Sequence, residues 1–282
     1  MRLRSCFLAF GAFGLIGAAA PQSPPRRIVS LNLCSDQYVM ALADPGQIAA
    51  LSHNARDPDL SAGATQAMRL PILRDAREEV LAIRPDLLIG YPDGAGGIVN
   101  APRTLRTRML GLESAENHAA IVAQIRQVAA AVGHRARGEA LIARIDRDLA
   151  GLRPLPDAGV AAYYQRRGYM TGTGTLVDEL MGRVGLINLA ARLGKPGLAQ
   201  IPLEQMVAAR PDWLIIESAT QKVVDQGTEM LHHPALDAIP RLSLPQAWTV
   251  CGGPSYVTAA RSLIAQMRVL RRQASRGAPG RH

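Results

Sequence analysis

Aromatic residues are scarce in this sequence of 282 residues, where Phe, Trp and Tyr together make up 4%. Proteins that bind nucleic acid usually combine a basic face with aromatic rings on which the bases stack. The formal net charge is +9, but two arginines lie among the first four residues and four among the last twelve. The part of the chain that folds therefore carries only about +3. These features exclude nucleic acid as a partner.

Long apolar runs are also missing after the first twenty residues. The one early run, residues 7–19, follows Met1-Arg2-Leu3-Arg4 and ends in the small residues before Pro21. It is too short for a good membrane span, although an uncleaved anchor is the alternative. A basic start, a short apolar run and a small-residue cleavage site predict a secretory signal peptide over residues 1–20. We expect an exported protein that begins near Pro21.

Only three cysteines occur, and the predicted cleavage leaves Cys34 and Cys251. An oxidising compartment permits a disulfide between them, but the sequence leaves open whether they lie within bonding distance. A free Cys34 with His53 as its base is the alternative, that of an exported enzyme. No cysteine-flanking motif supports it. We therefore predict that the protein is not an enzyme.

The six histidines are scattered, which disfavours a bare metal-ion site. Such a site needs three or four ligands that converge, whereas the neighbours His232 and His233 cannot easily point the same way. Gly172-Thr173-Gly174 resembles part of a phosphate loop but lacks the Gly-Lys-Ser/Thr ending. We expect neither a metal site nor a resident cofactor.

A twelve-residue stretch occurs twice, as EEVLAIRPDLLI from Glu78 and as EQMVAARPDWLI from Glu204, with seven identical positions. Proline disfavours helix for the residue before it, so each copy predicts a short helix that stops near the arginine. The apolar run after Arg-Pro-Asp predicts a strand buried on both faces. Two copies of a helix-strand unit indicate two similar lobes.

Alternating strands and helices in both halves predict an α/β fold with two lobes and a ligand cleft between them. Residues 134–152 show a helical apolar stripe and would span roughly 28 Å, long enough to join the lobes. We predict an N-terminal lobe over residues 26–133, a connecting helix over 134–152 and a C-terminal lobe over 158–270. The arginine-rich residues 271–282 are predicted to be a disordered tail.

Local patterns add further expected elements. We expect Ser35 and Asp36 to cap the first helix, a helix over residues 102–110 and a strand over 112–115. We also predict a helix over residues 226–231 and a last strand over residues 247–250.

Ligands of open α/β sheets bind beyond the carboxyl ends of the strands. Aromatic rings and arginines in the loops that follow predicted strands suit a bulky ligand with anionic groups. The candidate ligand-binding residues are Arg56, Tyr91, Arg166, Arg167, Tyr169 and Tyr256. The alternative for each of them is that it is an ordinary loop residue without a role in binding.

Glu78 and Glu204 occupy the same position in the two repeats, at the start of a short helix. The helix dipole alone favours a carboxylate there. Two equivalent carboxylates on two lobes would also suit arginines on a pseudo-symmetric partner.

The predicted signal peptide, the paired Glu-to-Arg-Pro-Asp units and the linking helix resemble periplasmic substrate-binding proteins of the iron-siderophore and cobalamin ABC importers. The segments RIVSLNLCSDQ from Arg27 and WTVCGGP from Trp248 look like a cobalamin-binding-protein-like branch. The resemblance covers nearly the whole mature chain.

The resemblance implies a monomeric periplasmic receptor with little hinge motion that holds a metal chelate between its lobes. It also implies delivery to a permease dimer powered by a cytoplasmic ATPase, with Glu78 and Glu204 docking onto permease arginines. Tyr91 matches an aromatic residue that follows the first repeat strand in cobalamin-binding relatives. Arg166 and Arg167 favour an acidic chelate, so a ferric siderophore, a corrinoid and haem all stay open as ligands.

Overall fold

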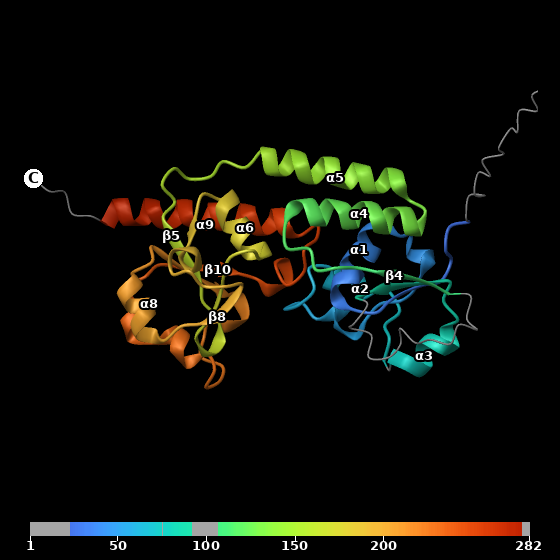
Figure 1. Cartoon of the computed structure of the whole chain (residues 1–282), viewed down its shortest axis with the longest axis horizontal. Coiled ribbons are helices and arrows are strands. Elements are labelled where there is room, and N and C mark those ends of the chain that lie inside the picture. The colour runs from blue at the N-terminus through green and yellow to red at the C-terminus, as the bar shows by residue number, and fades with distance from the viewer. Residues whose placement is uncertain (1–22, 75, 92–106, 278–282) are drawn as a thin grey trace, which may run out of the picture.

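The computed structural model describes residues 23–74, 76–91 and 107–277, which form two lobes on either side of a central junction (Figure 1). The predicted signal peptide lies outside these residues. The first lobe and the helices above it contain β1 (Ile28–Ser30), α1 (Leu33–Leu42), β2 (Ile48–Ala50), α2 (Ala64–Ala67), α3 (Ala76–Ile83), β3 (Leu87–Gly90), β4 (Arg108–Gly111), α4 (His118–Val132) and α5 (Arg135–Ala150).

The second lobe follows an extended segment after α5. Its elements are β5 (Val160–Tyr163), β6 (Tyr169–Thr171), α6 (Leu176–Arg183), β7 (Ile187–Asn188), α7 (Leu189–Arg192), β8 (Leu198–Gln200), α8 (Leu203–Ala209), β9 (Trp213–Glu217), β10 (Arg241–Leu244) and α9 (Tyr256–Gly277). Short 3₁₀ turns occupy several of the connections.

Each lobe is built on a four-stranded sheet whose neighbouring strands are all parallel. The strand orders are β2-β1-β3-β4 and β10-β9-β5-β7. A separate antiparallel pair, β6 and β8, lies in the second lobe. Parallel strands are buried on both faces, which explains the apolar run of β3 and that of residues 213–216 in β9.

Side chains alternate between two cores along each strand. Ile28, Leu87 and Ile89 face a large core that extends through both lobes and includes α4, α5 and α9. Leu88 packs instead with Val80 of α3, and its counterpart Leu214 packs with Met206 of α8. Each sheet therefore separates a shared helical layer from its own small outer helix.

The repeated Arg-Pro-Asp has the same structural role in both lobes. Arg84 and Arg210 end their helices with left-handed φ angles of 51° and 45°. The Asp86 carboxylate accepts backbone hydrogen bonds from Arg26 and Arg27 at 2.7 and 3.0 Å, and Asp212 accepts one from Val160 at 2.7 Å. Each aspartate thus fixes the beginning of the neighbouring strand.

Three predicted elements are wrong because sheet pairing and tertiary contacts override the local pattern. Residues 108–111 form β4, paired in parallel with β3, where a helix over 102–110 and a later strand over 112–115 were expected. Residues 102–106 lie outside the described part. The expected strand over 247–250 is instead a 3₁₀ turn, Gln246–Trp248, closed by a hydrogen bond from Trp248 N to Pro245 O.

Three predicted helices also differ from the structure, in the capping residue, in the type of helix or in the end of the helix. Asn32, rather than Ser35 or Asp36, caps α1, because its side chain accepts from the backbone of Cys34 and Ser35. The expected helix at 226–231 is a 3₁₀ turn, Glu229–His232. The last helix, α9, continues to Gly277, so the tail is helical well past the predicted end at 270. The Arg271 side chain binds the main-chain oxygens of Pro156 and Asp157, and arginine and alanine favour helix.

The predicted connecting helix corresponds to α5, which packs antiparallel against α4 above the first lobe (Figure 1). The crossing to the second lobe is completed by residues 151–159, in extended and turn conformation. Arg268 of α9 donates to the oxygen of Arg153 at 2.5 Å, so α9 holds this crossing segment in place.

The carboxylate of Asp36 is fully buried in α1. It accepts hydrogen bonds from the backbone and hydroxyl of Ser52 at 3.0 and 2.5 Å, which ties α1 to the loop after β2. Burial raises the pKa of Asp36 to about 6, although the hydrogen bonds and His53 oppose the shift.

We predict that Asp86→Ala lowers the free energy of unfolding by about 2 kcal/mol and Asp212→Ala by about 1 kcal/mol, because each lost hydrogen bond costs about 1 kcal/mol. Urea denaturation measures both values. Asp→Asn at either position retains an oxygen acceptor and should cost less. Ala variants as stable as the wild type would contradict the role of these carboxylates.

We predict a pH dependence from Asp36. The folded state holds this proton more tightly than the unfolded chain, so the contribution of Asp36 to stability is greatest below pH 3.8 and is lost as the pH rises through about 6. The difference in unfolding free energy between wild type and Asp36→Asn should change by up to about 3 kcal/mol across this window. Parallel curves of stability against pH would show that Asp36 titrates normally.

Candidate functional site

The segments that follow the strands of the two lobes meet at the junction. Cys34, just after β1, forms a disulfide with Cys251, with the two Cα atoms 5.3 Å apart. Tyr38 donates a hydrogen bond to the oxygen of Gly252 at 2.5 Å. A Cβ atom on Gly252 would lie 2.1 Å from the oxygen of Ala115, so this close approach requires glycine. The bonded Cys34 has no free thiol, which overturns the alternative of an enzyme with a Cys34 nucleophile.

Two carboxylates exchange helix caps across the junction. Glu116, before α4, accepts from the first backbone N–H of α6 at Leu176 at 3.0 Å. Glu179 of α6 accepts in return from the backbone of His118, the first residue of α4, at 2.6 Å. Helix N-termini present unsatisfied N–H groups and favour negative charge. Each lobe therefore supplies an acceptor for one N–H at the start of a helix of the other lobe, in addition to the local caps Asn117 and Thr175.

Three of the predicted ligand-binding residues, Arg166, Arg167 and Tyr169, come together on the turn between β5 and β6. Arg167 has a φ angle of 58°, and its backbone N–H donates to Gly227 O at 2.7 Å. Gln200 donates to the oxygen of Arg167 at 2.7 Å, which braces the turn from β8.

The two arginines of this turn differ in their availability. Arg166 forms an ion pair with Asp225. Arg167 is exposed, and its guanidinium makes no hydrogen bond or ion pair with the other residues that the structure describes. Tyr169 is 39% exposed, and nearby Val223 and Val224, which precede Asp225, are 54% and 61% exposed. The turn thus presents an uncompensated cation beside apolar surface.

The other predicted ligand-binding residues have different surroundings. Tyr91 follows β3 and is half-buried, and burial followed by the charge of Glu116 raises its pKa. Arg56 donates to the oxygens of Ala67 and Leu70 at 3.2 and 2.8 Å, so it supports the loop before α3.

Tyr256 is fully buried, with the Arg183 guanidinium 5.8 Å from its ring centre. In this structure a ligand cannot reach its ring.

Sequence reasoning missed a buried polar group at the carboxyl ends of β5 and β9. Glu217 ends β9 and accepts from Gln165 at 3.0 Å, with the Tyr163 hydroxyl 3.4 Å away. Thr171 donates to the other end of the Gln165 amide at 3.0 Å. A carboxylate that ends an apolar strand was the available signal. These hydrogen bonds hold Gln165 directly before the turn that carries Arg166 and Arg167, which we call the arginine turn.

A pocket of about 380 Å3 also lies between the lobes. It is lined by Gln37, Met40, Ala41, Ala62, Gly63, Gln66, Trp248, Pro254, Ser255 and Thr258. None of the six predicted ligand-binding residues belongs to this lining, so the sequence analysis did not find it. Gln37 brings an almost buried amide, whose nitrogen has no hydrogen-bond partner among the described residues.

Glu78 and Glu204 are exposed in the first turns of α3 and α8. These two helices lie on the lower side of the molecule in Figure 1, one on each lobe, while α4, α5 and α9 run along the upper side. A shallow hollow of about 660 Å3 beside Glu204 is lined by Leu203, Val207, Ala208, Arg210, His233 and Ala235. The helices that carry the repeated carboxylates therefore lie on the same side of the molecule, one on each lobe.

Within residues 23–74, 76–91 and 107–277, no three His, Cys, Asp or Glu side chains cluster as metal ligands would. His118 lies 3.0 Å from Asp146, and His134 lies 3.2 Å from Asp44, so both histidines have a carboxylate partner at the surface. None of the helices in these ranges is long and apolar enough to cross a membrane.

Solved structures share this architecture. The periplasmic haem-binding protein HutB of Vibrio cholerae is 19% identical, with a TM-score of 0.70 over 86% of this chain and 98% of that one. The periplasmic vitamin B12 binding protein BtuF of Vibrio cholerae is 17% identical, with a TM-score of 0.64 over 89% and 99%. A protein of an ABC-type Fe3+-hydroxamate transport system from Saccharomonospora viridis is 18% identical, with a TM-score of 0.63 over 86% and 93%.

These structures confirm the predicted two-lobed α/β fold, and identities this low show the fold alone. A search of curated protein sequences finds no match. The family described as periplasmic binding protein matches residues 28–240, which is most of the chain. The chain therefore belongs to the periplasmic binding protein family.

Proposed function

We propose that this protein captures a metal chelate in the periplasm and delivers it to an ABC permease without chemical turnover. Membership of the periplasmic binding protein family supports a binding role. Similar folds include proteins that bind vitamin B12, haem and a ferric hydroxamate. The observation that carries the proposal is the pair of exposed glutamates, Glu78 and Glu204, on matching helices of the two lobes.

The proposal includes export to the periplasm and docking onto the permease. Residues 1–20 act as the signal peptide, and the mature chain works as a monomer in the periplasm. Glu78 and Glu204 bind arginines on the two subunits of a permease dimer, which a cytoplasmic ATPase drives. Glu–Arg pairs are suited to such docking because the planar guanidinium donates two parallel hydrogen bonds to a carboxylate.

The chelate is bound near the arginine turn of the second lobe, with Tyr91 contributing from the first. Arg167 brings a cation without a protein partner among the described residues, and Tyr169, Val223 and Val224 bring exposed apolar surface. These features favour a bulky ligand with carboxylate or other anionic groups. A ferric siderophore fits this chemistry, and haem, with its carboxylates, is the second candidate. A corrinoid would use mainly the apolar and aromatic surface.

We predict saturable 1:1 binding without turnover of at least one ligand from a panel of ferric siderophores, haem and cobalamin. Isothermal titration calorimetry measures the affinity, and chromatography of the recovered ligand tests for chemical change. If the ligand is anionic, Arg167→Gln should weaken binding about tenfold, the effect of losing one charge-assisted hydrogen bond. Arg69→Gln removes the same charge from an exposed site of the first lobe and should not.

Absence of saturable binding across this panel would contradict the proposed function. Equal losses with Arg167→Gln and Arg69→Gln would contradict the role of the arginine turn and leave the receptor function intact.

We predict that Glu78→Ala combined with Glu204→Ala abolishes uptake of the bound chelate and leaves its affinity unchanged. Both side chains are exposed on outer helices, so their loss removes docking contacts without disturbing either core. Uptake by cells that express the receptor with its permease and ATPase is the measurement, and calorimetry supplies the affinity.

The matched control is Glu139→Ala combined with Asp146→Ala. These residues are two exposed carboxylates of α5, on the opposite side of the molecule (Figure 1). Uptake should survive this change. Loss of chelate affinity in the Glu78 and Glu204 variant, or equal loss of uptake in both variants, would refute the docking role.

A further inference from the structure

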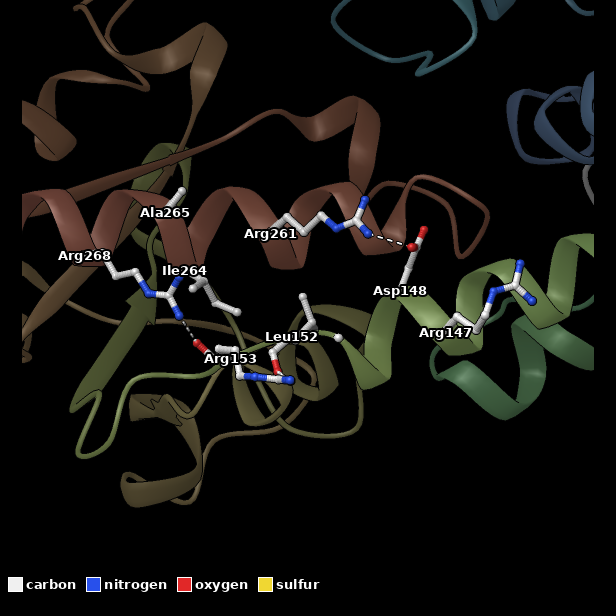
Figure 2. A pocket seen from close by; sticks show the side chains of 9 residues that line it. Arg147, Asp148, Leu152, Arg153, Arg261, Ile264, Ala265 and Arg268 are labelled. Atoms are coloured by element: carbon white, nitrogen blue, oxygen red, sulfur yellow. Dashed lines mark hydrogen bonds and ion pairs between the residues drawn. The ribbon is translucent and has the colours of Figure 1, made fainter.

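A groove with a basic rim lies where the end of α5 and the crossing segment meet α9, and Figure 2 shows the side chains that line it. Its volume is about 260 Å3. The charged residues of its lining are four arginines and a single carboxylate, namely Arg147, Arg153, Arg261, Arg268 and Asp148. The excess of positive charge is concentrated on one small hollow.

Three of these arginines are held in position by the protein. Arg261 pairs with Asp148 at 2.7 Å, and Arg268 donates to the main-chain oxygen of Arg153 at 2.5 Å. The Arg153 guanidinium donates to the oxygens of Ala150 and Leu152 at 3.3 and 3.0 Å. A guanidinium has more N–H donors than these bonds use, so each keeps donors for a ligand. The lost side-chain entropy on binding is correspondingly small.

The side chain of Arg147 is exposed, and its guanidinium makes no hydrogen bond or ion pair with any other residue that the structure describes. Arg147 lies at the α5 end of the lining, and its guanidinium points away from the other three arginines (Figure 2). Ile264, buried, and Leu152, partly buried, lie between the arginines and form an apolar floor. An apolar floor lowers the local dielectric and strengthens each interaction with an anion.

We propose that this groove binds a small polyanion of the diphosphate class. The guanidinium groups of Arg153, from the crossing segment, and of Arg261 and Arg268, from α9, are spread along the groove rather than gathered at one point (Figure 2). That spacing suits a ligand with more than one charged group, and the guanidinium fork matches phosphate oxygens. The volume lies just below that of ordinary small-ligand pockets, about 300–1,000 Å3, and is small for a peptide of several residues.

This site is separate from chelate binding and from docking. The groove lies along the upper side of the molecule in Figure 1, formed by α5 and α9, whereas α3 and α8 lie on the lower side. A bound diphosphate that joins Arg153 to Arg268 would fasten the crossing segment to α9. The group would come from a free diphosphate or from the headgroup of a phosphorylated lipid.

The test is calorimetric titration of the full mature chain with inorganic pyrophosphate, in metal-free buffer at low ionic strength. We expect 1:1 binding. Arg153→Gln combined with Arg268→Gln should weaken it about a hundredfold, which corresponds to about tenfold for each charge-assisted contact. The control, Arg69→Gln combined with Arg192→Gln, removes two exposed arginines elsewhere on the chain and should leave the affinity unchanged.

Absence of pyrophosphate binding, or equal losses in the two double variants, would overturn the proposal. Hexaglutamate that binds more tightly than pyrophosphate would overturn the ligand class and identify an acidic peptide instead. Flotation with phosphatidylcholine vesicles, with and without cardiolipin, whose headgroup carries two phosphates, separates the two sources. Binding to the anionic vesicles that pyrophosphate displaces supports a lipid headgroup, and its absence supports the free anion. Circular dichroism of both variants confirms that they fold.

Discussion

The junction between the lobes is the contact on which the other features depend. The caps from Glu116 to α6 and from Glu179 to α4 are reciprocal, so separating the lobes would leave two helix N-termini without their carboxylates. The disulfide between Cys34 and Cys251 adds a covalent link at the same place. A core shared by both lobes continues beneath α4, α5 and α9. These links explain physically why little hinge motion is expected, and they fix the relative positions of α3 and α8.

The repeated stretch has two parts with different contacts. Arg-Pro-Asp makes contacts within its own lobe, whereas the first glutamate is exposed on the surface. Arg84 and Arg210 end their helices in the left-handed region, the prolines prevent continuation, and Asp86 and Asp212 bind the start of the next strand. These contacts account for Arg-Pro-Asp entirely within each lobe. Glu78 and Glu204 have no comparable internal contact among the described residues. The helix dipole favours a carboxylate at both positions, and their similar places on the two lobes also fit the proposed docking to a partner.

Helix-ending prolines and apolar periodicity are signals that act over a few residues. They were sufficient to predict the two helix-strand units, the α/β class and the helices α4 and α5. Elements decided by distant contacts were missed. Residues 108–111 became a strand because β3 offers a free edge, and residues 246–248 turn before the junction. The same limit applies to the site. Tyr256 looks like a loop aromatic in the sequence, yet α9 and Arg183 bury it, while Glu217 ends a strand without any recognisable motif.

Because the junction is rigid, the proposed receptor must select its ligand through short loops that are already ordered. The turn at Arg167 shows how this is achieved. A non-glycine residue at a φ of 58° is locally unfavourable, and here bonds from Arg167 to Gly227 and from Gln200 to Arg167 hold it. Arg166 is fastened to Asp225 on the same loop. Because these groups are ordered before a ligand arrives, less entropy is lost on binding. Under the proposed function, the unrepeated loops determine the ligand and the repeated helices supply the docking surface.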